Sequence, residues 1–175
     1  MRRKPLKPQD RNMTLQANLT PDTFWDYTVS RYGKNDMQAK CLYLQNTASV
    51  NVNLLLLLCW FMENAFVVTL PQFAQLKAAI AESEDAIHRH RERRKAAHPD
   101  APQGDALLYE QRKVEELILE KAQQRLLLDE LSTLSLSHAG SAMNPAIVAF
   151  IHLYSLKEKP QAMQVVKDVV STCTQ

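Results

Sequence analysis

Residues 51–64 read NVNLLLLLCWFMEN, and this stretch decides how the chain folds. Asn51 is a favourable helix N-cap, and the residues after it are apolar on every side of a helical turn. A helix of that kind is buried on all sides. A transmembrane helix needs about 20 apolar residues, whereas this run is interrupted by Asn53 and Glu63. We therefore predict a central core helix from residue 52 to about residue 64, and no membrane span.

Two amphipathic helices are predicted before the core helix. The first starts at Thr20-Pro21-Asp22, where Thr suits the N-cap and Pro the first turn, and ends at Gly33, which we expect to be left-handed. Its expected inward side chains are Trp25, Val29 and Tyr32. Asn35 or Asp36 is expected to cap the second helix. Apolar residues of that helix recur at helical spacing, at Met37, Cys41, Leu44 and Ala48.

A long helical hairpin is predicted after the core helix. Thr69-Leu70-Pro71-Gln72 has the spacing of a capping box and starts a helical pattern that continues to about Ala97, with Ser83 placed to re-cap or kink it. Residues 98–104 contain two prolines, which break the helix. Asp105 then caps the longest helix, which runs to about residue 133. Its predicted inward residues are Leu107, Val114, Leu117, Ile118, Ala122, Leu126 and Leu131.

The remaining segments complete an all-α prediction. Residues 1–19 are charged and lack an apolar period, which predicts a disordered basic tail. Two C-terminal helices are expected within residues 142–175, after a loop at 135–141. No stretch alternates apolar and polar residues between turn dipeptides, so we expect no strands. The predicted fold is a single-domain, all-α bundle of six to eight helices over residues 20–175, with the long hairpin packed against the core helix.

The composition argues against several classes of protein. The three glycines are too widely separated for a Walker loop or a dinucleotide-binding fingerprint. Three cysteines without close spacing, and no signal peptide, favour a reducing cytoplasm. The net charge of +2 hides two local excesses of positive charge, one in the first 20 residues and one in residues 89–95. The rest of the chain is close to neutral, so its overall attraction to nucleic acid is modest.

Three short motifs carry a resemblance to a known family. They are Phe24-Trp25-Asp26-Tyr27, Cys41-Leu42-Tyr43-Leu44-Gln45 and Asn51-Val52-Asn53-Leu54-Leu55-Leu56, followed by the Arg-rich helix end and the long Glu/Arg/Leu helix. Together they resemble a family of small proteobacterial proteins known only as a domain of unknown function, in which Asp often replaces Asn51. The resemblance covers about residues 24–134. It implies a bacterial, cytoplasmic helical protein and no particular activity, ligand or catalytic residue.

Histidines and cysteines are the first candidates for chemistry. His88 and His90 are two residues apart on a helix and point about 200° apart, so they cannot share a metal ion. The cysteines Cys41, Cys59 and Cys173 lie on apolar stretches, and we interpret them as structural. His152, alone in an apolar run, is interpreted as a core or rim residue rather than a base. We therefore assign no catalytic, cofactor-binding or metal-binding residue and expect no cofactor.

Polar residues near the core helix are the next candidates. Asn53 precedes a wholly apolar run, so its amide must find partners on another helix, which we favour, or on a ligand in a pocket. The aromatic residues at helical spacing are interpreted as core: Trp25, Tyr27, Tyr32, Trp60 and Phe61. The carboxylates of Glu82, Asp85, Glu115 and Glu116 are interpreted as solvated.

The strongest charge feature is a basic cluster, formed by Arg89, Arg91, Arg93, Arg94 and Lys95. These side chains could contact a protein partner or the phosphates of a nucleic acid. The alternative, which we favour, is neutralisation by the return helix. If the hairpin turns about Ala101, facing residues have numbers that sum to about 202. Arg93 would then face Tyr109 and Glu110, and carboxylates would meet the basic residues near the loop.

Three functional hypotheses follow from the sequence. The first is a non-enzymatic cytoplasmic protein that acts through an unidentified protein partner or as a homo-oligomer. The second is a weak nucleic-acid binder that uses the basic cluster and the N-terminal tail. The third is a helical bundle that binds a small molecule or lipid. An apolar cavity lined by Trp25, Asn53 and Trp60 would favour the third hypothesis over the others.

Overall fold

The computed structural model describes residues 18–34, 36–139 and 143–175. It contains eight α-helices within these residues, which confirms the all-α bundle. The elements are α2 (Pro21–Tyr32), α3 (Met37–Ala48), α4 (Val52–Glu63), β1 (Phe66–Val67), α5 (Leu70–Ala79), α6 (Ala81–Ala96), α7 (Ala106–Thr133), β2 (Ser137–His138), α8 (Ala146–Leu153), a short 3₁₀ helix (Leu156–Glu158) and α9 (Pro160–Cys173). Most of the predicted disordered tail, 1–19, lies outside the described residues.

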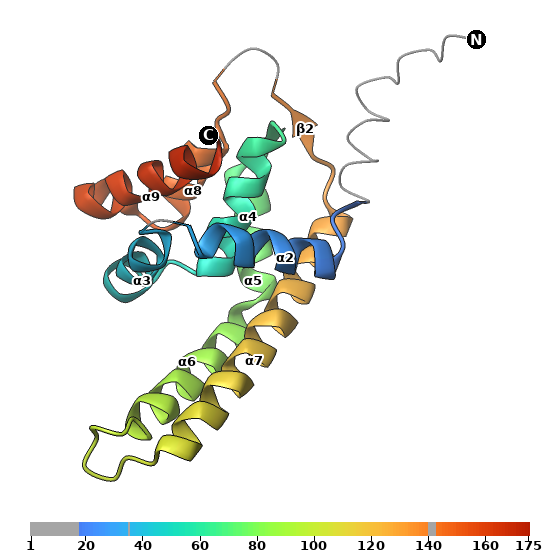
Figure 1. Cartoon of the computed structure of the whole chain (residues 1–175). Helices are drawn as coiled ribbons and strands as arrows, with labels where there is room; N and C mark the ends of the chain where they lie inside the picture. The colour runs from blue at the N-terminus through green and yellow to red at the C-terminus, as the bar shows by residue number, and fades with distance from the viewer. Residues whose placement is uncertain (1–17, 35, 140–142) are drawn as a thin grey trace.

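Helix α4 is the centre of the core, as predicted (Figure 1). Leu54, Leu55, Leu57 and Leu58 are completely buried on successive positions of one helix. Helices α8 and α9 pack against α4, while α3 contacts both α4 and α9. Because neighbours surround α4 on all sides, an apolar residue is required at nearly every position. Among the described residues, no helix has the length and apolar character needed to cross a membrane.

The helix starts follow the sequence closely. Asn51 Oδ1 accepts a hydrogen bond from the backbone N–H of Leu54 at 2.9 Å, and Thr20 and Thr69 both form capping boxes. The end of α2 differs from the prediction, since Gly33 has φ −78° and is right-handed. Its N–H instead continues the helical pattern by bonding Val29 O. Asp36 takes the N-cap position of α3 without a capping side-chain bond.

The predicted first arm of the hairpin is two helices rather than one. Helix α5 ends at Ala79 and α6 begins at Ala81, with Ile80 at the break and Ser83 Oγ donating to Ile80 O at 2.9 Å. Only α6 and α7 form the hairpin, which extends away from the other helices (Figure 1). Their loop is tight, because Asp105 N–H bonds Ala97 O at 3.0 Å, and a Cβ at Gly104 would overlap the His98 carbonyl.

The predicted inward face of α7 is wrong over most of its length. Leu107, Val114 and Ile118 are 85%, 59% and 64% exposed, and Leu117 and Leu126 are exposed as well. The first part of α7 packs on α6 through polar side chains, and only its last part reaches the core. The buried residues of α7 are Gln123, Gln124, Leu127, Leu128 and Leu131.

Two smaller predictions are also corrected. On α2 the buried side chains are Phe24 and Thr28, while Val29 is exposed, so the helix is rotated relative to the predicted face. The prediction of no strands fails at one point, where β1 and β2 form an antiparallel pair two residues long. Such a short pairing leaves no alternating pattern in the sequence.

Candidate functional site

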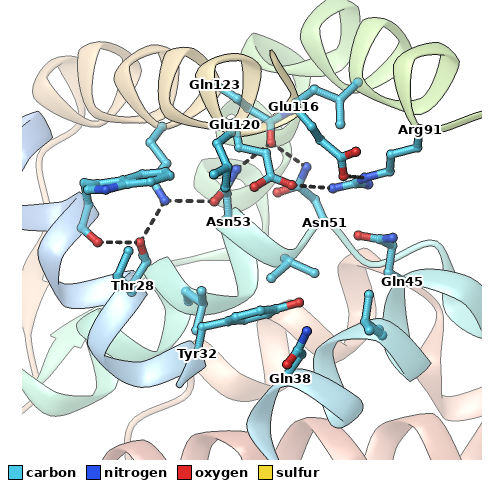
Figure 2. A pocket seen from close by; sticks show the side chains of 18 of the residues that line it. Thr28, Tyr32, Gln38, Gln45, Asn51, Asn53, Arg91, Glu116, Glu120 and Gln123 are labelled. Carbon is cyan, nitrogen blue, oxygen red and sulfur yellow. Dashed lines mark hydrogen bonds and ion pairs between the residues drawn. The ribbon is translucent and has the colours of Figure 1, made fainter. Parts of the chain in front are cut away.

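A pocket of about 630 Å³ lies where the base of the hairpin meets the first three helices (Figure 2). Helices α2 and α3 form one side, the start of α4 forms the floor, and α6 and α7 form the other side. Two of the three residues named for the third hypothesis, Trp25 and Asn53, line it, but Trp60 is in the core and the pocket floor is polar, so the stated condition is met only in part. The principal lining residues are Trp25, Thr28, Tyr32, Gln38, Leu42, Gln45, Asn51, Asn53, Leu56, Ile87, Arg91, Glu116, Leu117, Glu120, Gln123 and Gln124.

A chain of carboxamide groups crosses the floor of this pocket. Gln123 Oε1 accepts from Asn51 Nδ2 and from Asn53 Nδ2, both at 2.9 Å. Gln123 Nε2 donates to Ser83 Oγ at 2.9 Å, which ties the chain to α6. The partners of Asn53 therefore lie on another helix, which confirms the favoured interpretation. Nothing local distinguishes Gln123 in the sequence, since it sits in a helix rich in Glu, Arg and Leu.

Gln124 extends the same chain to α2 and leaves one atom unpartnered. Its Nε2 donates to Asn53 Oδ1 at 2.9 Å and to Thr28 Oγ1 at 3.0 Å (Figure 2). Gln124 is only 2% exposed, yet its buried Oε1 accepts no hydrogen bond from any described residue. Buried polar atoms nearly always have a partner. Gln124 lines the pocket, but this oxygen is enclosed by its neighbours, so an occupant could donate to it only if a neighbouring side chain moves.

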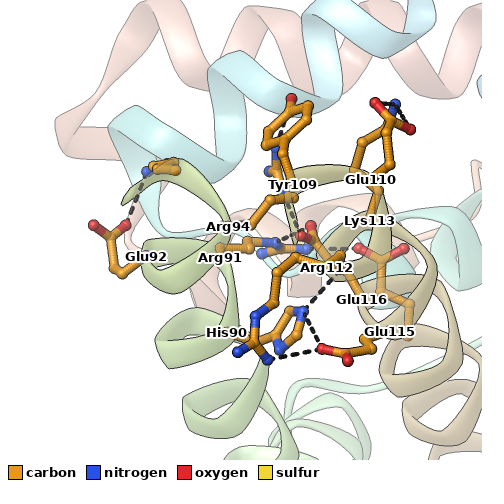
Figure 3. A network of polar contacts seen from close by, with 12 residues as sticks. His90, Arg91, Glu92, Arg94, Tyr109, Glu110, Arg112, Lys113, Glu115 and Glu116 are labelled. Carbon is orange, nitrogen blue, oxygen red and sulfur yellow. Dashed lines mark hydrogen bonds and ion pairs between the residues drawn. The ribbon is translucent and has the colours of Figure 1, made fainter. Parts of the chain in front are cut away.

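The opposite rim of the pocket is an ion-pair network between α6 and α7 (Figure 3). Arg91 bonds Glu116 Oε1 at 3.1 Å and Glu120 Oε1 at 2.8 Å, and Arg94 bonds the second oxygen of Glu116. The predicted neutralisation by the return helix is thus confirmed for these two arginines. The prediction that Glu116 is solvated is wrong, since its side chain is 13% exposed. Burial raises the pKa of the Glu120 carboxyl, and Arg91 opposes this shift.

The other members of the basic cluster face outward. Lys95 pairs with Glu92 at 2.9 Å on the same helix. Arg89 and Arg93 are exposed, and neither has an ion pair with a described residue. Arg93 was predicted to face Tyr109, but Arg94 does so, with Nη1 3.4 Å from the Tyr109 hydroxyl. The cluster is therefore divided into a paired inner half and an exposed outer half.

The histidines and cysteines take structural positions. His90 is buried, with Nε2 2.8 Å from Arg112 O, whereas His88 is exposed, so the two point apart as predicted. Within the described residues no three His, Cys, Asp or Glu side chains are grouped to hold a metal. All three cysteines are free and buried, and burial raises the pKa of Cys41 to about 12. His152 is exposed on α8, which rules out the core alternative of its interpretation as a core or rim residue.

Fold and site together define a class of small all-α protein, in which a projecting helical hairpin closes one side of an amide-lined pocket. Residues 23–127, more than half of the chain, match the family described as Protein of unknown function (DUF2390). The chain belongs to this family. The matched range contains every residue that lines the pocket, from Trp25 to Gln124. No curated protein and no solved structure matches the chain.

Proposed function

We propose that this protein binds an uncharged, planar heteroaromatic molecule in the amide-lined pocket. The observation that carries the proposal is the pair of pocket carboxamides of Gln38 and Gln45, which hydrogen-bond no described residue, together with the unpartnered buried acceptor Gln124 Oε1 beneath the pocket. This ranks the third hypothesis, small-molecule binding, above the other two. The volume of about 630 Å³ falls within the range typical of pockets for drug-sized molecules.

The charges of the pocket argue against an anionic ligand. Three cations line it, and each is paired: Arg91 and Arg94 with Glu116, and Lys113 with Glu110 at 3.1 Å. An anion would have to displace a carboxylate from one of these pairs and would meet Glu120 beside Arg91. Moving an unpaired charge out of water is costly. A fatty acid or a phosphate ester is therefore a poor fit.

The hydrogen-bonding groups of the opposite side favour a ligand with both donors and acceptors. Figure 2 shows Tyr32, Gln38 and Gln45 on the α2–α3 side of the pocket, across from Glu120. None of their side chains hydrogen-bonds a described residue, so all three are available. A carboxamide carries a donor and an acceptor side by side, which matches the edge of a nucleobase or a similar ring. Trp25 and Tyr32 add aromatic surface for the flat face of such a ring.

The proposal is tested by equilibrium dialysis of the full chain against adenosine and guanosine, with decanoate as an anionic apolar control. We expect at least one nucleoside to be retained and to raise the melting temperature by several degrees at saturation. Decanoate should be retained no better than by an unrelated protein. Absence of nucleoside binding, or retention of decanoate alone, would overturn the proposal.

Two matched variants locate the binding. Leu42 and Leu126 are similarly exposed, at 40% and 42%, but only Leu42 lines the pocket. Leu42→Trp should lower nucleoside retention at least tenfold because the larger ring occupies pocket volume. Leu126→Trp should leave retention unchanged. Equal effects of the two variants would show that the ligand binds elsewhere.

The nucleic-acid hypothesis has weaker support, because Arg91, Arg94 and Lys95 would have to be unpaired for contact with phosphates. Within the basic cluster only Arg89 and Arg93 remain for that purpose, beside the N-terminal tail, most of which lies outside the described residues. We expect Arg89→Glu with Arg93→Glu to leave both the melting temperature and the retention on single-stranded DNA at physiological salt unchanged, since exposed charges contribute little to stability. A large loss of retention, with a shallower salt dependence, would instead support phosphate contacts.

A bacterial, cytoplasmic setting is part of the proposal. All three cysteines are free and buried, an arrangement common in proteins that fold in a reducing compartment. The three sequence motifs described above resemble a family of proteobacterial proteins, which supports the bacterial part of the proposal. Fractionation of the native cell, with detection of the full-length chain in the cytosolic fraction, tests this assignment directly.

A further inference from the structure

The outer face of α7 carries an apolar stripe, defined by Leu107, Val114 and Ile118. At about 100° per residue these three side chains fall within about 40° of one another around the helix. They are 85%, 59% and 64% exposed, so the described part of the chain leaves the stripe uncovered. The stripe is separate from the pocket, whose lining residues on α7 are on another face.

We propose that this stripe pairs with the same stripe of a second copy of the chain, with the two α7 helices antiparallel. Symmetric pairing is the commonest way in which soluble proteins cover such a face. The hairpin projects beyond the other helices, so its outer face is free to approach another molecule (Figure 1). The inference stands apart from the proposed ligand, because no stripe residue lines the pocket.

Charge complementarity selects the antiparallel direction. If the two-fold axis crosses α7 near residue 116, Val114 of one copy faces Ile118 of the other. Leu107 then faces Arg125, whose aliphatic part can cover it while the guanidinium reaches Glu110 one turn away. Both flanks of the stripe repeat by symmetry, so this ion pair forms twice. A parallel pair would place Glu110 beside Gln111 and Glu115 of the other copy, so Glu110 would gain no cation beyond Lys113 of its own helix, which lies 3.1 Å away.

The proposed contact between the two α7 helices is small. The stripe and its flanking charges run from residue 107 to residue 125, about 27 Å of helix. A contact between two helices of that length lies near the lower end of stable interfaces, which bury about 1,200–2,000 Å². We therefore expect a reversible dimer with a dissociation constant in the micromolar range.

Sedimentation of the full chain over about 1–200 µM tests the dimer. We expect the wild type to change from monomer to dimer across this range and Ile118→Glu to remain monomeric. Leu126→Glu is the matched control, since Leu126 is also exposed on α7 but lies off the stripe. It should dimerise as the wild type does. A monomeric wild type at 200 µM, or equal loss in both variants, would overturn the proposal.

A charge swap tests the direction of pairing. Glu110→Arg should weaken the dimer at least tenfold, because it sets two arginines side by side at each end. Adding Arg125→Glu should restore it. Arg125 is the better partner for the swap than Lys121, which already lies 3.6 Å from Asp22. A double variant as weak as Glu110→Arg would exclude the antiparallel register, and the melting temperature of each variant shows that it is folded.

Discussion

Leu57→Asp is expected to abolish cooperative folding. Leu57 is completely buried in α4, where neighbouring helices cover every side. The substitution leaves a cavity and places an ionisable carboxyl among apolar side chains without a partner. Loss of a buried Leu side chain costs about 2–5 kcal/mol, and the buried carboxyl adds several more. Because a domain of this kind is stable by only about 5–15 kcal/mol, we expect an unfolded or aggregated product.

Circular dichroism and urea unfolding measure this effect. Leu126→Asp is the matched control, since the same change at a side chain that is 42% exposed should alter stability by less than about 0.5 kcal/mol. A soluble Leu57→Asp variant that unfolds cooperatively near the wild-type midpoint would contradict the burial of α4. The helix would then be a surface rather than the centre of the core.

Gln123→Met is expected to cost about 2–4 kcal/mol of unfolding free energy, the second largest effect. Methionine has nearly the same length and is apolar, so the cavity is small. The change removes the acceptor shared by Asn51 Nδ2 and Asn53 Nδ2 and leaves both amide groups without it, while Ser83 Oγ loses one donor but keeps its bond to Ile80 O. Each buried polar group that loses its only partner costs about 1–3 kcal/mol.

The urea midpoint should fall while the dependence on urea stays the same. Gln111→Met serves as the control, because Gln111 is exposed and bonds only Glu115, at 3.0 Å, on the same helix. Its stability should stay within about 0.5 kcal/mol of the wild type. If Gln123→Met were equally neutral, the carboxamide chain would contribute nothing to holding α4 against α7. The pocket floor would then have to be rigid for another reason.

The parts of the fold that depend on local chemistry could be predicted from the sequence. The caps at Thr20, Asn51 and Thr69 were predicted correctly because each needs only a side chain and the amides of the next turn. The burial of α4 followed from a run that is apolar on every side. At Gly33 the local rule failed, because a glycine permits a left-handed conformation without requiring one.

The face of α7 could not be predicted from periodicity. Its apolar residues do recur at helical spacing, but the stripe through Val114 and Ile118 points to solvent. The helix is long, and only its last third reaches the core, so one stripe cannot describe the whole helix. Gln123 and Gln124 are buried because other helices supply partners for their amides, and no sequence pattern near them records that.

The backbone alignment of α6 and α7 in the hairpin was predicted more accurately than the ion pairs between their side chains. Asp105 N–H bonds Ala97 O, and His90 meets Arg112 O, so both pairs sum to the expected 202. The arginines depart from it, because Arg91 reaches past the facing position to Glu116 and Glu120. The loop fixes the backbone register. A long arginine side chain, by contrast, can pair with a carboxylate one or two turns away from the residue directly opposite it.

Helix α9 shows that the range matched by the family and the range that folds as one unit differ in this chain. The family match ends at residue 127, inside α7, and leaves out both α8 and α9. Yet α9 packs on α3 and α4 with Val166 and Val169 completely buried. A fragment cut at the family boundary would expose one side of α4 to water. A protein limited to the matched range would therefore have to shield that side by other means.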